Sequence, residues 1–294
     1  MQRNAIQSWA LLDPRPEIIV FGDEEGAADA CRELGVQHEP NVARTASGMP
    51  FADDLFDRAQ RLASSEILCY ANCDMVLCPD FVNAVGAVHR WGKSSPLLIV
   101  VQRWNAIVDE VLDGTGEWRP LLEARAKDEA DPGPIYALDV FAFTRGLFDR
   151  VPPFAIGRIG WDNWMVYGAR MKGAKVVDVS PVARAIHQRH DYSHHPDGKG
   201  GVYGGAEAER NIALLRAEVR HRVPMFGFRD VTHVLTPSGV RSVWRAQGLT
   251  DMRWRIDRLP VFHPVMAFPL RALKSILARL RARSRSGRAN SGRR

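Results

Sequence analysis

The run Leu97–Val101 constrains the fold more than any other stretch, because all five of its residues are apolar. A strand that is apolar on both alternating sets of residues has to be buried on both faces. Such strands are typical of sheets covered by helices on each side. The run therefore predicts a central strand of an α/β fold.

Strand-like and helix-like segments alternate around this run, which favours a doubly wound, mostly parallel sheet with flanking helices. We expect strands over residues 17–22, 36–39, 66–71, 135–143, 175–179 and 185–187, and helices over residues 25–34, 53–63, 79–89, 162–172 and 207–219. Residues 222–260 carry mixed signals.

Composition narrows the class of protein. The 294 residues are 46% hydrophobic and 25% charged, which is ordinary for a globular chain. No apolar run reaches the ~18 residues that a membrane-spanning helix needs. Four cysteines without a C-x-x-C pair predict a reducing, cytoplasmic setting rather than a disulfide framework.

The net charge of +6 comes from the C-terminal end. Residues 271–294 hold nine Lys and Arg and no acid, which leaves 31 bases against 34 acids in residues 1–270. The body of the chain is slightly acidic, so we expect no nucleic-acid partner.

Asn72-x-Asp74 follows the expected strand 66–71. Ligands of open α/β sheets gather outside the carboxyl ends of the strands, where an acid can hold a divalent cation that clamps a diphosphate. The alternative is a plain turn, in which Asn and Asp are common.

Gly160-Trp161-Asp162-Asn163-Trp164 places an acid between two indoles. Trp161 and Trp164 could form a wall on which a sugar ring stacks, with Asp162 as a general base for an acceptor hydroxyl. The alternative is that Asp162 only caps the helix expected over 162–172.

Residues 185–195 contain His187, His190, His194 and His195. An imidazole from this segment could complete the coordination of a cation on Asp74, and the alternative is a solvated loop of histidines. The glycine-rich stretch that follows carries Lys199, which could place a positive charge on phosphate oxygens, although no P-loop spacing is present.

Together these motifs resemble GT-A-fold nucleotide-diphospho-sugar glycosyltransferases, and in particular a group of uncharacterised bacterial, family 2-like glycosyltransferase-like proteins. The runs that carry the resemblance lie between Asn4 and Asn211. They are residues 4–9, 21–23, 69–74, 143–146, 152–157, 161–164 and 186–192.

The resemblance implies a metal-dependent transferase that moves a sugar from a nucleotide-diphospho-sugar to a glycan or lipid-linked hydroxyl in cell-surface glycan synthesis. It implies Mn²⁺ or Mg²⁺ held by Asp74 with His187 and His190. Asn72 falls on the first acid of the family's Asp-x-Asp motif, and Asp23 on a position that often contacts the nucleotide. Asp162 is implied as the acceptor-side acid, and a single base favours inversion.

Two rival classes remain open, a nucleotidyltransferase and a non-catalytic sugar-nucleotide or carbohydrate binder. The resemblance also implies that relatives have completed a first strand before the position at which this chain begins. Residues 1–220 are interpreted as the GT-A-like domain and residues 221–260 as an irregular extension.

Residues 261–294 are expected to form a basic amphipathic helix and a disordered tail. Apolar residues recur at helical spacing between Leu273 and Leu280, and the Lys and Arg residues fall outside that stripe. A helix of this kind predicts that the protein binds an anionic membrane surface. We therefore expect a location that is cytoplasmic or peripheral on the inner face of the membrane. The alternative is that the stripe packs on the protein's own core.

Overall fold

A computed structural model describes residues 1–108, 111–112, 131–190, 200, 203–219 and 226–243. These residues belong to one compact unit, Met1–Trp244. Lys199, His194, His195 and the helix expected within residues 261–294 lie outside the described residues. Among the described residues, no helix is both long and apolar enough to cross a bilayer.

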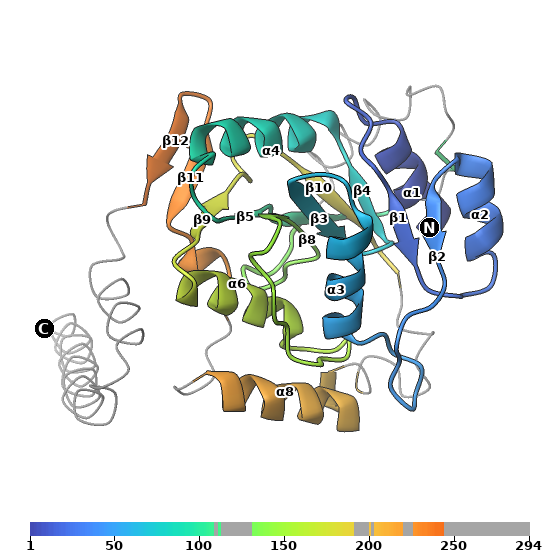
Figure 1. Ribbon diagram of the computed structural model, residues 1–294. Helices are drawn as coiled ribbons and strands as arrows, with labels where there is room; N and C mark the ends of the chain where they lie inside the picture. Colours follow the sequence, from blue (N-terminus) through green and yellow to red (C-terminus); the bar gives the residue numbers. More distant parts are fainter. Residues whose placement is uncertain (109–110, 113–130, 191–199, 201–202, 220–225, 244–294) are drawn as a thin grey trace, which may run out of the picture. The chain divides into compact units, whose positions relative to one another are not determined.

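The central feature is a six-stranded sheet in the order β12-β11-β9-β5-β8-β3 (Figure 1). Its strands are β3 (Ile67–Ala71), β5 (Leu97–Val100), β8 (Val140–Thr144), β9 (Lys175–Asp178), β11 (His233–Thr236) and β12 (Gly239–Ser242). β5 pairs in parallel with β9, and β9 with β11. β8 runs antiparallel to both β3 and β5, and β12 antiparallel to β11. Four of the six strands therefore point the same way.

The expected α/β fold is confirmed, and the structure adds two corrections. The segment expected as strand 135–143 is antiparallel to its neighbours, a direction that burial periodicity does not encode. Residues 233–242, which fall in the expected irregular extension, form the regular hairpin β11–β12 in the same sheet as β9.

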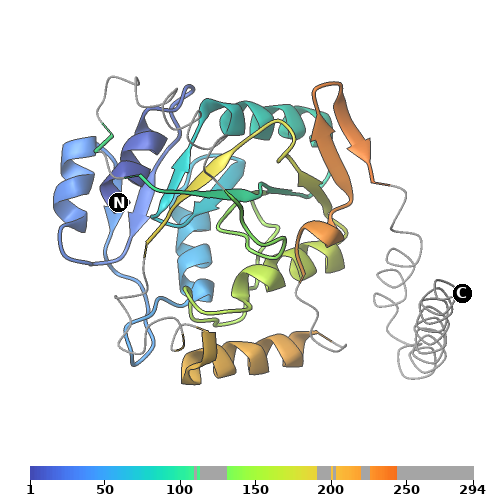
Figure 2. The same cartoon turned by 180° about the vertical axis from the view of Figure 1, so that it is seen from behind.

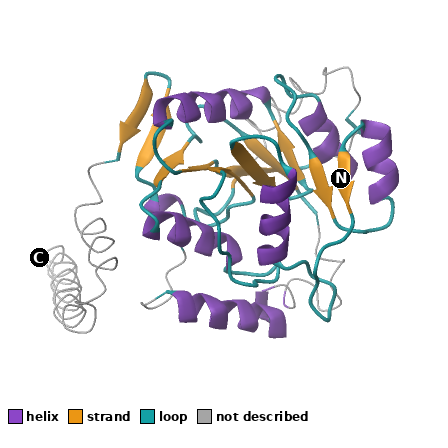
Figure 3. Cartoon of the chain, in the orientation of Figure 1, coloured by secondary structure: helices purple, strands orange, loops and turns teal. Residues whose placement is uncertain are grey.

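Helices cover both faces of this sheet, as the views from the front, from behind and by secondary structure show (Figures 1, 2 and 3). α4 (Pro79–Gly92) lies over one face, and its Val88 packs in one core with Leu97 and Ile99. α3 (Ala52–Leu62) and α6 (Trp161–Met171) lie over the other face. The four residues of β5 are fully buried, as the apolar run predicts.

The face under α3 and α6 is a cluster of aromatic side chains. Phe56 of α3 packs within about 6 Å, ring centre to ring centre, of five other rings. These belong to Tyr70, Phe141, Phe143, Phe148 and Trp161. This cluster fixes β3, β8 and the start of α6 against one another, because close-packed rings leave little room for displacement.

Two smaller sheets flank the central one. β4 (Met75–Leu77), β10 (Ala185–Gln188), β6 (Arg103–Ala106) and β7 (Asp131–Pro132) form a sheet in that order. β1 (Ile19–Phe21) and β2 (Gln37–Glu39) form a parallel pair of their own. The described helices outside the central layers are α1 (Gln2–Ala10), α2 (Ala27–Leu34) and α8 (Ala206–Glu218), with a short 3-10 turn η1 (Phe228–Asp230).

Candidate functional site

Asp74, His187 and His190 form a cluster of metal-ligating side chains where β4 pairs with β10. The antiparallel register sets His187 opposite Met75, the residue after Asp74. The N–H of Gln188 donates to the carbonyl of Asp74 at 3.0 Å. Because this backbone bond fixes β10 beside the turn, His187 and His190 come to Asp74 from a segment more than 110 residues later.

The two imidazoles converge on one carboxylate oxygen. Nε2 of His187 and Nε2 of His190 each lie 3.3 Å from Oδ2 of Asp74. One ligand atom from each residue lies within 4.8 Å of the others. Two atoms 3.3 Å apart, each about 2.1 Å from a shared ion, subtend roughly 100° at it, between the tetrahedral and octahedral values. The spacing therefore suits a single cation.

Two further observations fit a cation at this cluster. Oδ1 of Asp74 and Nδ1 of His187 are buried with no hydrogen-bond partner among the described residues, and buried polar atoms normally have one. Burial alone raises the pKa of Asp74, but the hydrogen bonds and charges of His187 and His190 outweigh it and hold that pKa below its usual value. The carboxylate is therefore ionised, as a ligand must be.

The donor set distinguishes between the two cations that the sequence predicts. Mg²⁺ strongly prefers oxygen ligands, whereas imidazole nitrogen suits transition metals. One carboxylate with two imidazoles therefore fits Mn²⁺ better than Mg²⁺.

Asn72 is held in a hydrogen-bond network beside Asp74. Tyr70 donates its hydroxyl to Oδ1 of Asn72 at 2.6 Å, and Nδ2 of Asn72 donates to Oδ1 of Asp139 at 2.9 Å. Both ends of the amide thus have hydrogen-bond partners, and a direct contact of Asn72 with a ligand stays a prediction. The N–H of Met75 also donates to the carbonyl of Asn72 at 3.0 Å. Asn72–Met75 is therefore a turn as well, and that turn presents Asp74.

Asp139 and Arg103 lie beside Asn72 although no sequence motif identifies them. Nη1 of Arg103 donates to Oδ2 of Asp139 at 2.9 Å, and both side chains are largely buried. Burial raises the pKa of Asp139, and the charge of Asp74 adds to that increase while Arg103 opposes it. An acid inside the otherwise apolar run 135–143 is the sequence signal that points to this residue.

Asp162 is the second residue of α6, next to Asp139. Gly160, in the left-handed region at φ 100°, begins the helix as its N-cap, a conformation that favours glycine. The N–H of Asn163 donates to Oδ1 of Asp162 at 2.9 Å and the N–H of Leu138 to Oδ2 at 3.3 Å. Burial, reinforced by the charge of Asp139, raises the pKa of Asp162 to about 7. A carboxyl group with that pKa can take a proton near neutral pH.

These acids form one cluster. Asp139 interacts electrostatically with both Asp74 and Asp162. Burial raises the pKa of Tyr70, and the charges of Cys73, Asp139, Asp74 and Asp162 raise it further. Hydrogen bonds link the same segments: Nδ2 of Asn72 donates to Asp139, and the N–H of Leu138, the residue before Asp139, donates to Asp162.

The tryptophans do not form the wall that the sequence suggests. Trp161 is 4% exposed and packs on Tyr70, Phe56 and Phe141. Trp164 is 6% exposed and packs on Phe148 and Phe154. The expectation that both indoles offer a face to a sugar ring is wrong, because α6 is buried over nearly its whole circumference.

Asp23 lies in the loop after β1, exposed to solvent and paired with Arg44 at 2.7 Å. Its neighbour Glu24 also pairs with Arg44, at 3.0 Å. Burial raises the pKa of Cys73, and the charges of Asp74 and then Glu24 raise it further. Glu24 therefore lies near the turn that carries Asp74. The expected contact of Asp23 with a nucleotide stays a prediction.

No family model matches the chain, and no curated protein matches its sequence. Among solved structures, glucosyl-3-phosphoglycerate synthase from Mycobacterium tuberculosis in complex with phosphoglyceric acid is similar with a TM-score of 0.46 and 16% identity, over 74% of this chain and 75% of that chain. A mannosyltransferase from Pyrobaculum calidifontis in complex with GDP-Man and Mn²⁺ is similar with a TM-score of 0.38 and 17% identity, over 62% of this chain and 51% of that chain.

Replacing Asp162 by Asn is expected to stabilise the protein at pH 8 and not at pH 4.5. The pKa of Asp162 in the folded protein is raised to about 7. Between about pH 4 and pH 7 the carboxyl group therefore keeps its proton in the folded chain and loses it in the unfolded chain. The free energy of unfolding falls as the pH rises through this range. Asn cannot ionise. A shift of three pKa units limits the stability that Asp162→Asn can gain at pH 8 to about 4 kcal/mol. Because the amide also weakens one backbone hydrogen bond, the expected net gain is on the order of 2 kcal/mol.

Urea unfolding at the two pH values measures this difference. Asp57→Asn on the exposed side of α3 is the matched control and is expected to change stability by less than about 0.5 kcal/mol. A loss of stability in Asp162→Asn that is equal at both pH values would contradict the account.

Proposed function

We propose that the chain is a metal-dependent glycosyltransferase that moves a sugar from a nucleotide-diphospho-sugar to an acceptor hydroxyl. One observation carries the proposal: three motifs far apart in the sequence meet in one cluster. Asp74 comes from the run 69–74, Asp162 from the run 161–164, and His187 and His190 from the run 186–192. These are runs on which the resemblance to GT-A-fold glycosyltransferases rests.

Each residue has a role that its surroundings support. Asp74, His187 and His190 would hold Mn²⁺, which when bound supplies positive charge opposite a diphosphate leaving group. Asp162 accepts the proton of the acceptor hydroxyl as the hydroxyl oxygen attacks the anomeric carbon and the diphosphate leaves. A chain of hydrogen bonds positions the turn of Asp74, and it runs through Arg103, Asp139, Asn72 and Tyr70.

Inversion at the anomeric carbon is the stereochemical course we propose. A double displacement would need a second carboxylate free to act as nucleophile. Asp139 is the nearby candidate, but its Oδ1 accepts from Asn72 and its Oδ2 from Arg103. A carboxylate held in an ion pair is a weaker nucleophile than one with backbone donors alone, so a single displacement assisted by Asp162 is favoured.

We expect Mn²⁺-dependent release of nucleoside diphosphate when the protein is given a panel of UDP-, GDP- and TDP-sugars. Turnover is expected to rise with pH through an apparent pKa near 7, because Asp162 must lose its proton to act as a base. Asp162→Asn should lower kcat by about a hundredfold or more and leave the KM for the donor nearly unchanged. Asp57→Asn is the control.

Several outcomes would overturn parts of this proposal. If Asp162→Asn keeps its turnover while Asp74→Ala abolishes it, Asp162 is not the base. Binding of a nucleotide-sugar without turnover would favour a non-catalytic binder. Release of pyrophosphate from a nucleoside triphosphate and a sugar phosphate would favour a nucleotidyltransferase.

We also propose that residues 261–294 bring the enzyme to an anionic membrane surface, where a lipid-linked acceptor would lie. The support is the basic amphipathic pattern between Arg271 and Arg281, since each Lys or Arg near such a surface contributes about 1 kcal/mol. In liposome flotation, the full chain is expected to float with anionic vesicles and a chain ending at Pro260 to stay behind. Equal behaviour of the two chains would contradict it.

A further inference from the structure

Three tryptophan and tyrosine side chains are exposed in the described part of the chain. They are Trp91 at 41%, Tyr136 at 46% and Tyr203 at 48%. Single exposed hydrophobic residues are ordinary on a protein surface, so the position of each ring decides whether it serves a ligand. Hydrogen bonds connect the backbone of Tyr136 to α6 beside Asp162.

The segment over residues 131–139 passes both halves of the candidate site. At one end Asp131 forms an ion pair with Arg189, which directly follows β10. At the other end the N–H of Leu138 donates to Oδ2 of Asp162 at 3.3 Å. The exposed tyrosine of this segment lies two residues before Leu138, and therefore on the side of the expected base.

Buried contacts hold the backbone on either side of Tyr136. Nδ2 of Asn163, a residue that is 1% exposed, donates at 2.7 Å to the carbonyl of Tyr136 and at 2.7 Å to the carbonyl of Phe226. The N–H of Phe228 donates to the carbonyl of Ile135 at 2.9 Å. Because one amide of α6 joins the two segments, the helix that carries Asp162 also fixes the position of Tyr136.

Gly227 lets these two segments come close together. A Cβ atom at Gly227 would lie 2.4 Å from the carbonyl oxygen of Ile135 and 2.8 Å from the Cα of Tyr136. An approach this close of one backbone to another requires glycine. The backbone of Tyr136 is thus packed between α6 and residues 226–228, whereas its side chain stays about half exposed.

Chain geometry limits the distance between Tyr136 and Asp162. Two residues of extended chain span at most about 7 Å, and the N–H of Leu138 lies 3.3 Å from Oδ2 of Asp162. The Cα of Tyr136 is therefore within about 10 Å of that carboxylate. An aromatic ring and a carboxylate held this close can contact one sugar unit together.

Asp162 is accessible to such a ligand. It is the one residue between Trp161 and Arg170 that is not buried. The indoles of Trp161 and Trp164 are buried in the core, so they cannot stack on a sugar. Tyr136 supplies, beside Asp162, the exposed ring that the indoles do not.

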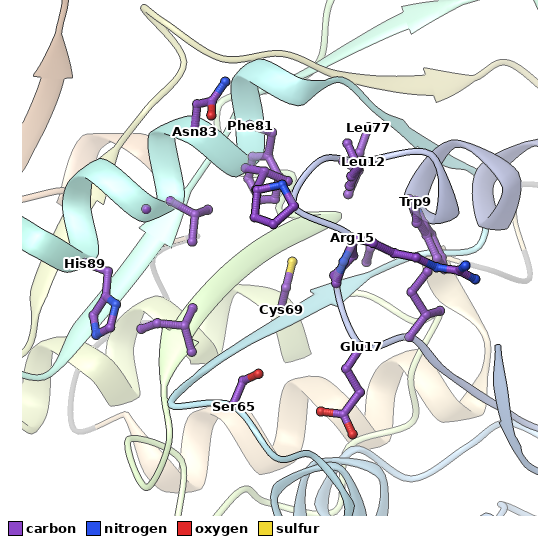
Figure 4. Close-up of a pocket in the computed structure, with 18 of the residues that line it drawn as sticks. Trp9, Leu12, Arg15, Glu17, Ser65, Cys69, Leu77, Phe81, Asn83 and His89 are labelled. Carbon is purple, nitrogen blue, oxygen red and sulfur yellow. The ribbon is translucent and has the colours of Figure 1, made fainter. Parts of the chain in front are cut away.

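The groove in Figure 4 is a separate feature. It has a volume of about 740 Å³ and lies among α1, β1, β3 and α4, with Trp9, Cys69 and Phe81 on its walls. Asp74 and Asp162 are not among the residues that line it. A hydroxyl bound in this groove would not meet the expected base, so we do not place the acceptor there.

A tyrosine ring beside a carboxyl group suits a sugar. One face of a pyranose ring presents C–H groups, which pack on an aromatic ring, and its edge presents hydroxyl groups, which donate to a carboxylate. A small alcohol without a ring would leave the tyrosine face in water. The pair of groups therefore favours an acceptor that is itself a sugar.

We propose that Tyr136 is the platform on which the acceptor stacks, and that the acceptor is a pyranoside whose hydroxyl meets Asp162. This inference rests on the proposed function, because that function supplies the reaction and the need for an acceptor hydroxyl. The stacking contact itself can be measured without turnover.

The test measures binding of the methyl α- and β-pyranosides of glucose, galactose and mannose to the full chain. Saturation-transfer difference NMR follows each pyranoside in the presence of Mn²⁺ and either UDP or GDP. We expect at least one pyranoside to bind, and Tyr136→Ala to raise its dissociation constant about fivefold or more, because the stacking contact is lost. Tyr136→Phe and Tyr136→Trp should keep the dissociation constant within about twofold of wild type, because both keep a ring face.

Trp91→Ala is the matched control. Trp91 is an exposed ring of α4 that packs on His233 and Lys175, which begin β11 and β9. Its loss removes an exposed aromatic ring of similar accessibility from another part of the sheet. We expect the dissociation constant of the pyranoside to be unchanged.

Three results would overturn the proposal. One is that no pyranoside of the panel binds the wild-type chain, and another is an equal dissociation constant in wild type and Tyr136→Ala. The third is that Tyr136→Ala weakens the binding of UDP or GDP instead, which would assign the ring to the nucleotide.

Release of nucleoside diphosphate, measured in parallel, separates these results from a failure of the proposed function. Turnover with an acceptor KM that does not change in Tyr136→Ala would contradict the platform and leave the transferase standing. Pyranoside binding that depends on Tyr136 without any turnover would support the platform and contradict the transferase.

Discussion

The antiparallel pairing of β4 with β10 is the interaction on which the candidate site depends. It sets His187 opposite Met75 and ties the backbone of Gln188 to Asp74. Successive strand residues point to opposite faces, so a slip of one residue would turn His187 away from the carboxylate. The register is held from several sides. β6 pairs with the other edge of β10, and α1 is anchored on β4, where the indole of Trp9 donates to the carbonyl of Met75.

The same small region holds carboxylates in different protonation states. Asp74 has two imidazoles and keeps its charge, whereas Asp162 has only backbone donors and a neighbouring acid, so its pKa rises to about 7. Pairs of acids whose surroundings separate their pKa values are typical of sites that combine an ionic ligand with a proton acceptor. The burial of Asp162 costs stability at neutral pH, and an acid perturbed in this way is a candidate functional group.

The sequence predicts the parts of this arrangement that rest on local pattern. The apolar run 97–101 identifies the central strand, and the ends of the segments 66–71 and 185–187 identify Asp74 and His187 as neighbours of a sheet edge. Other parts depend on contacts between distant segments. The pairing of Arg103 with Asp139, the engagement of Asn72 by Tyr70, and the direction of β8 are set by tertiary packing that no periodicity records.

The sequence around the two tryptophans also contains the pattern of a buried helix. The segment Trp161–Met171 is apolar around most of its circumference, which indicates a buried helix. The stacking capacity of Trp161 and Trp164 suggests a sugar-binding wall, but both indoles are buried in the core. On the same helix, the backbone N–H groups of Leu138 and Asn163 orient the carboxyl group of Asp162, and its role as a base stays a prediction.

We propose that Asp74, His187 and His190 together hold one divalent cation. Titration of the full chain with Mn²⁺, with free Mn²⁺ followed by electron paramagnetic resonance, tests it most directly. We expect one site per chain, with the Mn²⁺ affinity reduced at least tenfold by Asp74→Asn and by His187→Ala. His89→Ala, which removes a histidine of α4 that pairs with Glu66 instead, should leave the affinity unchanged. Equal affinity in the wild-type chain and in Asp74→Asn would contradict the account.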